Sequence, residues 1–276
     1  MFPGIRARAV RLAAPVLSLA CLGTAPAPKT DDVVARMTRY VSDYGTQLTN
    51  VVAEEAYRQR VRERSGRIET RTLRSDYALT RERNHGWIGY RDTFEVDGRA
   101  VRDREARLQR LLSSGAFDQA EEIMRLNSRF NLDSDLFSRT VNVPTFAIEL
   151  LHSRNQDRFS HRRLGVQVVD GREAWTLEFR ERDRPTLVRT PGGGNQPTRI
   201  VTLVDPATGE VLRTTSTWEE VRGSVIVSYG RVPALPVLVP LEMIEQFTTS
   251  GGAVIEGTAT YANYRQFETS GRLLEP

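Results

Sequence analysis

The stretch from Arg199 to Tyr229, RIVTLVDPATGEVLRTTSTWEEVRGSVIVSY, constrains the fold of this chain more than any other. Residues 200–204 and 211–218 alternate between apolar and polar side chains with a period of two, which is typical of strands with one drier face. The residues between them are typical of a turn. Asp205 supplies a side-chain acceptor, Pro206 a fixed φ and Gly209 a positive φ. Residues 224–229 form a third run of the same kind, so the sequence predicts an antiparallel meander.

The same strand and turn pattern recurs along most of the chain. Segments with period-two alternation, separated by turn residues such as Ser65-Gly66, Asp97-Gly98 and Asp170-Gly171, are residues 53–61, 73–79, 86–96, 166–169, 174–180, 241–248 and 253–267. Together with the opening meander they predict nine to eleven strands. Residues 231–240 contain three prolines and are expected to form an edge or a loop over the rim of the sheet.

Helices are expected at the start and in the middle of the chain. Thr30 is a suitable N-cap, and apolar residues then recur at steps of three and four as far as Val51 and Val52. A helical insert is expected over residues 102–151, with Pro144 in the first turn of its last helix. The predicted fold class is α+β, a large curved antiparallel sheet (half-barrel) wrapped around the long N-terminal helix and the helical insert.

The first residues resemble an export signal. Residues 1–20 combine Arg6, Arg8 and Arg11 with an apolar run from Leu12 to Ala20, which is too short to span a bilayer. Cys21 follows directly, and residues 21–29 have the composition of a tether. Two alternatives stay open: Cys21 is the lipid attachment site of a lipoprotein, or the signal is cleaved nearby without lipidation. Residues 30–276 are then expected to form one domain, in the periplasm or anchored at the envelope.

The charge pattern argues against a nucleic-acid partner. The formal net charge is +4, but Arg6, Arg8 and Arg11 account for three of these four charges. Elsewhere arginines are interleaved with acidic residues, which is typical of solvated strand and helix faces. The chain has a single cysteine, so an internal disulfide is excluded. A monomer is expected.

The order of these elements resembles the LolA/LolB-like outer-membrane lipoprotein carrier superfamily. The resemblance rests on an export signal, a helix that leads into a strand, a curved meander, a helical segment and the hairpin from Val204 to Arg213. It implies a half-open barrel that curls around helices and encloses an apolar cavity for acyl chains. No functional residue of that superfamily matches a position in this chain, and the insert at 102–151 is larger than a simple carrier requires.

If the fold is a half-barrel, its concave face is expected to carry large apolar residues that bind the ligand. The candidates are Trp87, Phe94, Trp175, Leu177, Phe179, Trp218, Val227 and Tyr229. The alternative for each of them is that it packs against the helices as ordinary core, since core aromatic residues outnumber those that line ligand sites.

No motif indicates an enzyme or a cofactor. The glycine run at 192–194 lacks the helix and lysine of a phosphate-binding loop, and neighbouring carboxylates such as Glu54 and Glu55 point to opposite faces of a strand. Glu149, His152 and His161 are too few and too scattered to indicate a metal site. Three readings remain: a protein that binds lipid or another hydrophobic ligand, an envelope interaction or sensor module that uses the insert as its partner surface, and a hydrolase that uses these three residues.

Overall fold

A computed structural model describes residues 28–48, 51–82, 86–101, 130–132, 141–190, 192–233 and 235–266 of the chain. The helical elements are α1 (Thr30–Gln47), α5 (Phe146–Leu150) and the 3-10 helix η1 (Ser153–Arg158). The strands are β1 (Val51–Arg62), β2 (Ile68–Glu82), β3 (Gly86–Val96), β4 (Arg99–Ala100), β5 (Phe159–Val169), β6 (Arg172–Glu181), β7 (Arg199–Val204), β8 (Val211–Trp218), β9 (Gly223–Arg231), β10 (Leu238–Thr248) and β11 (Val254–Gln266).

All the strands belong to one antiparallel sheet, as the sequence predicts. The order is β4-β3-β2-β1-β11-β10-β9-β8-β7-β6-β5, so consecutive strands are neighbours except at one place. There β1 pairs with β11 over most of its length, from Val51 opposite Gln266 to Arg62 opposite Val254. The sheet stays open, because β4 and β5 lie at its two ends without pairing to each other.

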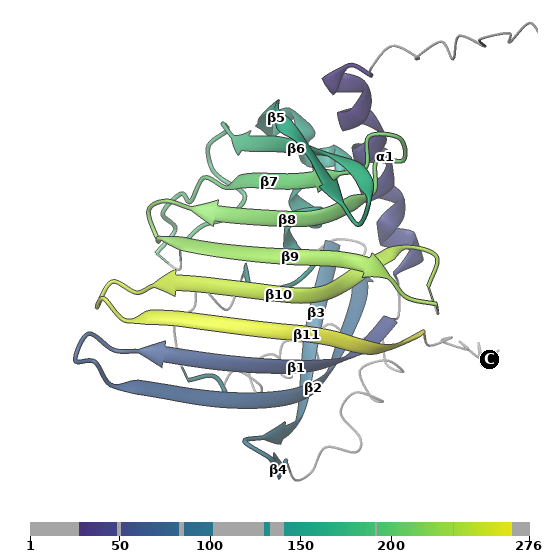
Figure 1. The fold of residues 1–276 in the computed structure, drawn as a ribbon. Helices are drawn as coiled ribbons and strands as arrows, with labels where there is room; N and C mark the ends of the chain where they lie inside the picture. Colours follow the sequence, from purple (N-terminus) through teal and green to yellow (C-terminus); the bar gives the residue numbers. More distant parts are fainter. Residues whose placement is uncertain are drawn as a thin grey trace, which may run out of the picture.

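The sheet is strongly curved, and β3 passes behind β10 and β11 (Figure 1). We call its concave side the inner face. The alternating burial of β8 and β9 shows that one face of the sheet is covered and the other is wetter. The half-barrel predicted from the sequence is therefore confirmed for the part of the chain that the structure describes.

Helix α1 packs against the sheet and crosses the strands near their ends (Figure 1). Its apolar stripe is fully buried and consists of Val33, Met37, Val41, Tyr44 and Leu48. Asp31 and Asp32 stand in its first turn, where carboxylates favour the positive helix end. Because this stripe packs on a sheet that bends around it, α1 is the centre of the hydrophobic core.

The turn between β7 and β8 is docked on the backbone of α1. Asp205 Oδ1 accepts hydrogen bonds from the amides of Ala207 and Thr208, at 2.8 and 3.2 Å. The Arg36 guanidinium of α1 donates to the carbonyl of Pro206 at 2.7 Å. Gly209 has a φ of +81°, and a Cβ added to it would lie 2.5 Å from the carbonyl carbon of Arg36. The motif that predicts a hairpin thus also fixes the helix to the sheet.

Two expectations about element bounds are wrong. Helix α1 ends at Gln47, and Val51 and Val52 instead open β1, where both are completely buried. Residues 238–240 begin β10 in the middle of the sheet, although the prolines suggested an edge or a loop. Pro240 is tolerated there because the pairing of β10 with β9 shifts by one residue between Pro240 and Glu242.

Most of the expected helical insert and the whole front end lie outside the described residues, including residues 1–20 and Cys21. Residues 130–132, within the insert, contact the inner face. The side chain of Gln59 accepts from the amide of Leu132 at 2.9 Å and donates to Asn131 at 3.0 Å. Pro144 precedes α5, whose residues Ala147, Ile148 and Leu150 are buried.

Candidate functional site

Six of the eight predicted ligand residues lie together on the inner face. They are buried in the core, with exposed fractions of at most 7%, and are Trp175, Leu177 and Phe179 of β6, Trp218 of β8, and Val227 and Tyr229 of β9. We call this surface, over β5–β9, the apolar half of the inner face. Helix α5 covers it in part, since the ring of Phe146 lies 6.0 Å from that of Trp218. The conformation described here is therefore packed at these residues, and their contact with a ligand stays a prediction.

The other two candidates lie elsewhere. The ring of Phe94 lies 5.4 Å from the guanidinium carbon of Arg74, which in turn contacts Glu54 at 3.5 Å. Arg74 is exposed and follows the buried Leu73 in β2, so it projects from the outer face, and Phe94 lies there with it. Of Trp87, the structure describes only the backbone, within β3.

The other half of the inner face, formed by β1, β2, β3 and β11, carries buried polar side chains that the sequence analysis missed. We call it the polar half. At its centre, Arg91 Nε donates to Glu55 Oε2 at 2.6 Å, and the Glu55 side chain has no exposed surface. Arg91 Nη2 also donates to the carbonyl of Asn142 at 3.0 Å. The arginine thus connects strand β3 to β1 and to the segment that precedes α5.

Tyrosine rings surround this ion pair. The Arg91 guanidinium lies 5.2 Å from the ring centre of Tyr57 and 5.3 Å from that of Tyr77. Tyr261 packs edge-on against Tyr77 at 5.5 Å. Aromatic faces of this kind attract a cation and exclude water from it. The ion pair of Arg91 and Glu55 is therefore surrounded largely by aromatic rings.

Burial raises the pKa of Tyr77 and of Tyr261 above the ordinary value, and the charge of Glu55 adds to this effect. Burial lowers the pKa of Arg91, but the Glu55 carboxylate outweighs it and holds that pKa well above its usual value. At neutral pH the cluster therefore contains an ion pair and neutral hydroxyls. Such groups can bind and orient a polar group, but the phenols are not poised as nucleophiles or bases.

A second buried carboxylate lies on the same face. The hydroxyl of Tyr57 donates to Glu245 Oε1, and Glu245 is 1% exposed. Its side chain lies against Gly257 in β11, where an added Cβ would be 2.4 Å from Glu245 Oε1. Gly257 therefore makes room for this hydrogen bond. One sequence signal pointed to these groups, because Glu55 and Gln59 share the alternation phase of Ala53 and Tyr57.

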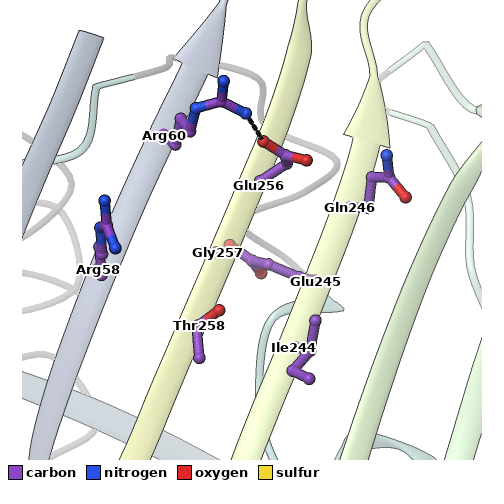
Figure 2. A pocket seen from close by; sticks show the side chains of 8 residues that line it. All are labelled: Arg58, Arg60, Ile244, Glu245, Gln246, Glu256, Gly257 and Thr258. Atoms are coloured by element: carbon purple, nitrogen blue, oxygen red, sulfur yellow. Dashed lines mark hydrogen bonds and ion pairs between the residues drawn. The ribbon is translucent and has the colours of Figure 1, made fainter.

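The outer face has a shallow pocket of about 300 Å³ over β1, β11 and β10. Figure 2 shows Arg58, Arg60, Glu256 and Gln246 around it, with Arg60 and Glu256 forming an ion pair. The residues around it are mostly of charged or polar types, and it lies on the opposite side of the sheet from the apolar half. It is not the apolar cavity that the sequence predicts.

The side chains of the three residues considered for a hydrolase contact other residues. Glu149 pairs with Arg154, His152 Nδ1 accepts from the amide of Arg154 at 3.3 Å, and His161 contacts Asp31 at 3.1 Å. Among the described residues, no group of three or more histidine, cysteine or acidic side chains could hold a metal ion.

Glu178 on the outer face of β6 is held by three arginines. It is almost fully buried and contacts Arg162 at 2.6 Å, Arg180 at 3.1 Å and Arg199 at 2.6 Å. Hydrogen bonds from Arg180, and then from Arg162 and Arg199, lower the pKa of Glu178 from 4.5 to about 2 against the opposing effect of burial. This carboxylate therefore stays ionised far into the acid range.

Glu178→Gln is expected to make folding stability less sensitive to acid. Because the pKa of Glu178 is lower in the folded state, its contribution is complete above about pH 4.5 and is lost as the pH falls toward about 2. The difference in unfolding free energy between the wild type and Glu178→Gln should thus shrink across that range. Urea denaturation at a series of pH values measures it. A difference that stays constant with pH would contradict the assignment.

Among known proteins, the chain matches solved structures only, at low identity. No protein-family model matches the chain, and neither does any curated protein. Solved structures that match the chain include a DUF1329 family protein from Desulfovibrio piger, at 12% identity and a TM-score of 0.40 over 88% of this chain and 92% of that one. A putative outer membrane lipoprotein-sorting protein domain from Vibrio parahaemolyticus has 12% identity and a TM-score of 0.36 over 88% and 93%.

The LolA superfamily protein NE2245 from Nitrosomonas europaea has 9% identity and a TM-score of 0.32 over 87% of this chain and 97% of that one. Proteins of the LolA superfamily and of outer membrane lipoprotein sorting, which the sequence resembles, are thus among the structures that the chain matches. As for the membrane, no helix among the described residues combines the length and the apolar character that a membrane span needs.

Proposed function

We propose that this chain is an exported, non-enzymatic envelope protein that binds a lipid or another hydrophobic ligand on the inner face of its half-barrel. One observation carries the proposal: an open, curved sheet presents an apolar surface that is covered beside Trp218 by the short helix α5, separately from the long helix α1. Helix α5 has only five residues, and its three buried side chains rest on this surface. A cover of this size costs little to displace compared with an intact core helix.

The contact between Phe146 and Trp218 marks where an acyl chain would enter. Phe146 is only partly buried, whereas Trp218 beneath it is 1% exposed. The entrance segment is tied to the sheet by Tyr229, whose hydroxyl donates to the carbonyl of Pro144 at 2.7 Å. An apolar ligand that replaces the Phe146 ring would gain contact with the indole and would leave this hydrogen bond in place.

The polar half supports the same proposal. An amphipathic ligand has one apolar end and one polar end, and the inner face offers both surfaces side by side. The six core residues named above would contact the chain of such a ligand, and the region around Arg91 and Glu55 would lie near its polar end. Cys21 as a lipid anchor, and the periplasm or the envelope as the location, belong to the proposal as well.

Phe146→Ala is expected to strengthen binding of an acyl ligand. Removing the ring uncovers Trp218, so a fluorescent fatty acid should bind several-fold more tightly and should quench tryptophan emission. Titration of the purified protein measures the affinity, and native mass spectrometry shows whether lipid co-purifies. Phe94→Ala is the matched control, since it removes the same ring from the outer face and should leave binding unchanged.

The second candidate is a protein-interaction or sensor module whose interior is filled by its own residues. The tight burial of the six apolar candidates favours it. If no lipid co-purifies and Phe146→Ala takes up no more probe than Phe94→Ala, this candidate replaces the first. A partner protein whose capture depends on residues 102–151 would then be expected.

A further inference from the structure

Strand β5 ends the sheet opposite β4, and its outer edge is long. It spans 11 residues, whereas β4 spans two. Apart from Phe159, all of its residues are exposed or only half-buried, so the part of the chain that the structure describes leaves most of its side chains uncovered. An uncovered edge strand carries a row of backbone N–H and C=O groups that can pair with another chain. We propose that β5 binds an extended acidic and apolar segment of another protein, which adds to the sheet as a further strand.

The apolar part of the argument comes from three side chains at this edge. Leu164, Val166 and Val168 are 44%, 45% and 75% exposed. They are three of the seven large apolar residues that are exposed in the described part of the chain. Val166 and Val168 stand opposite Trp175 and Glu173 in β6, so they extend the apolar half of the inner face to the edge. An added strand would cover them with its own apolar side chains.

The charge of the edge selects an acidic partner. Strand β5 contains His161, Arg162 and Arg163 and has no acidic residue. Arg163 lies over the indole of Trp175, at 3.7 Å from the ring centre. Arg162 shares the carboxylate of Glu178 with two further arginines, so positive charge exceeds negative charge at this site. Acidic side chains on an incoming strand would meet that excess.

The same features argue against a second copy of this chain as the occupant. Two β5 strands paired with each other would bring together two basic segments with no acid between them. The proposal does not depend on a ligand in the half-barrel.

A synthetic peptide of alternating glutamate and valine, equal in length to β5 and fluorescently labelled, tests the proposal by anisotropy with the full protein. Two further peptides carry N-methyl groups, one at the odd positions and one at the even positions. Because alternate residues of a strand direct their N–H groups to opposite edges, only one of these peptides should lose binding. If both N-methylated peptides bind, the contact is electrostatic adsorption and the proposal fails.

Val168→Glu is the matching change in the protein. It should weaken binding of the unmodified peptide by about tenfold or more, because it replaces apolar contact with like charge. Ile68→Glu is the control: Ile68 is 50% exposed in β2, and the charge change is the same. Equal effects of the two variants would overturn the proposal. So would a dimer of the free protein that Val168→Glu dissociates, because β5 would then be an interface between copies.

Discussion

Gly209→Ala is expected to destabilise the protein by about 3 kcal/mol or more, because it combines a strained backbone with an overpacked contact. An alanine at a φ of +81° is unfavourable in any setting. Here the added methyl group would also lie 2.6 Å from the amide nitrogen of Met37 and 2.5 Å from the carbonyl carbon of Arg36. Backbone atoms cannot rotate away, so the turn must leave the helix. Urea denaturation measures the loss.

Gly171→Ala separates the two causes. Gly171 also has a positive φ, +76°, but no atom lies within 4 Å of the position of its added Cβ. This variant should cost only the backbone strain, about 1 kcal/mol. The difference between the two variants then measures the docking of the turn onto α1. If both variants lose the same stability, the close approach of the turn to the helix is contradicted.

Arg91→Met is expected to cost about 3 to 5 kcal/mol of unfolding free energy, because it leaves the carboxylate of Glu55 buried without its counter-ion. The side chains of Arg91 and Glu55 are 17% and 0% exposed, so water cannot replace the arginine easily. The double change of Arg91→Met with Glu55→Leu should recover much of the loss, since a buried ion pair and an apolar pair of similar volume are often close in stability.

Arg60→Met is the control for this prediction. Arg60 and Glu256 also form an ion pair between strands, but their side chains are 38% and 40% exposed. A pair so open to water should contribute about 1 kcal/mol at most. Denaturant unfolding of the four proteins completes the comparison. Equal losses for Arg91→Met and Arg60→Met would show that Glu55 is not confined as the structure indicates.

Local sequence patterns predicted the elements well where a strand has clear turns at its ends. Strand β3 was predicted as residues 86–96, and the structure gives the same bounds. The two strands before it in the chain, β1 and β2, were also found, although both are longer than predicted. The helix was predicted to continue as far as Val52 instead of Gln47, and the first strand to begin at residue 53 instead of 51, because Val51 and Val52 suit either periodicity.

The pairing of β1 with β11 and the role of Arg91 could not be read from the sequence. Period-two alternation assigns faces within a strand but does not name its partner across the chain. In the sequence, Arg91 is one charged residue among many. Only the pairing of β2 with both β1 and β3 brings it near Glu55, with β2 between the two strands. Pro240 was misjudged for the same reason, since a bulge in a central strand depends on its neighbours.

Strand β11, which is synthesised near the end of the chain, inserts between β10 and β1, the first strand to be synthesised. The ribosome delivers β1 and β2 about two hundred residues before β11 emerges, as the printed sequence shows. Until β11 emerges, the edges of β1 and β10 that pair with it have no partner. Contacts this distant along the chain slow folding and prolong the time in which unpaired margins are open to aggregation. A chaperone that shields β1 during delivery would therefore protect this fold more than one that acts after release.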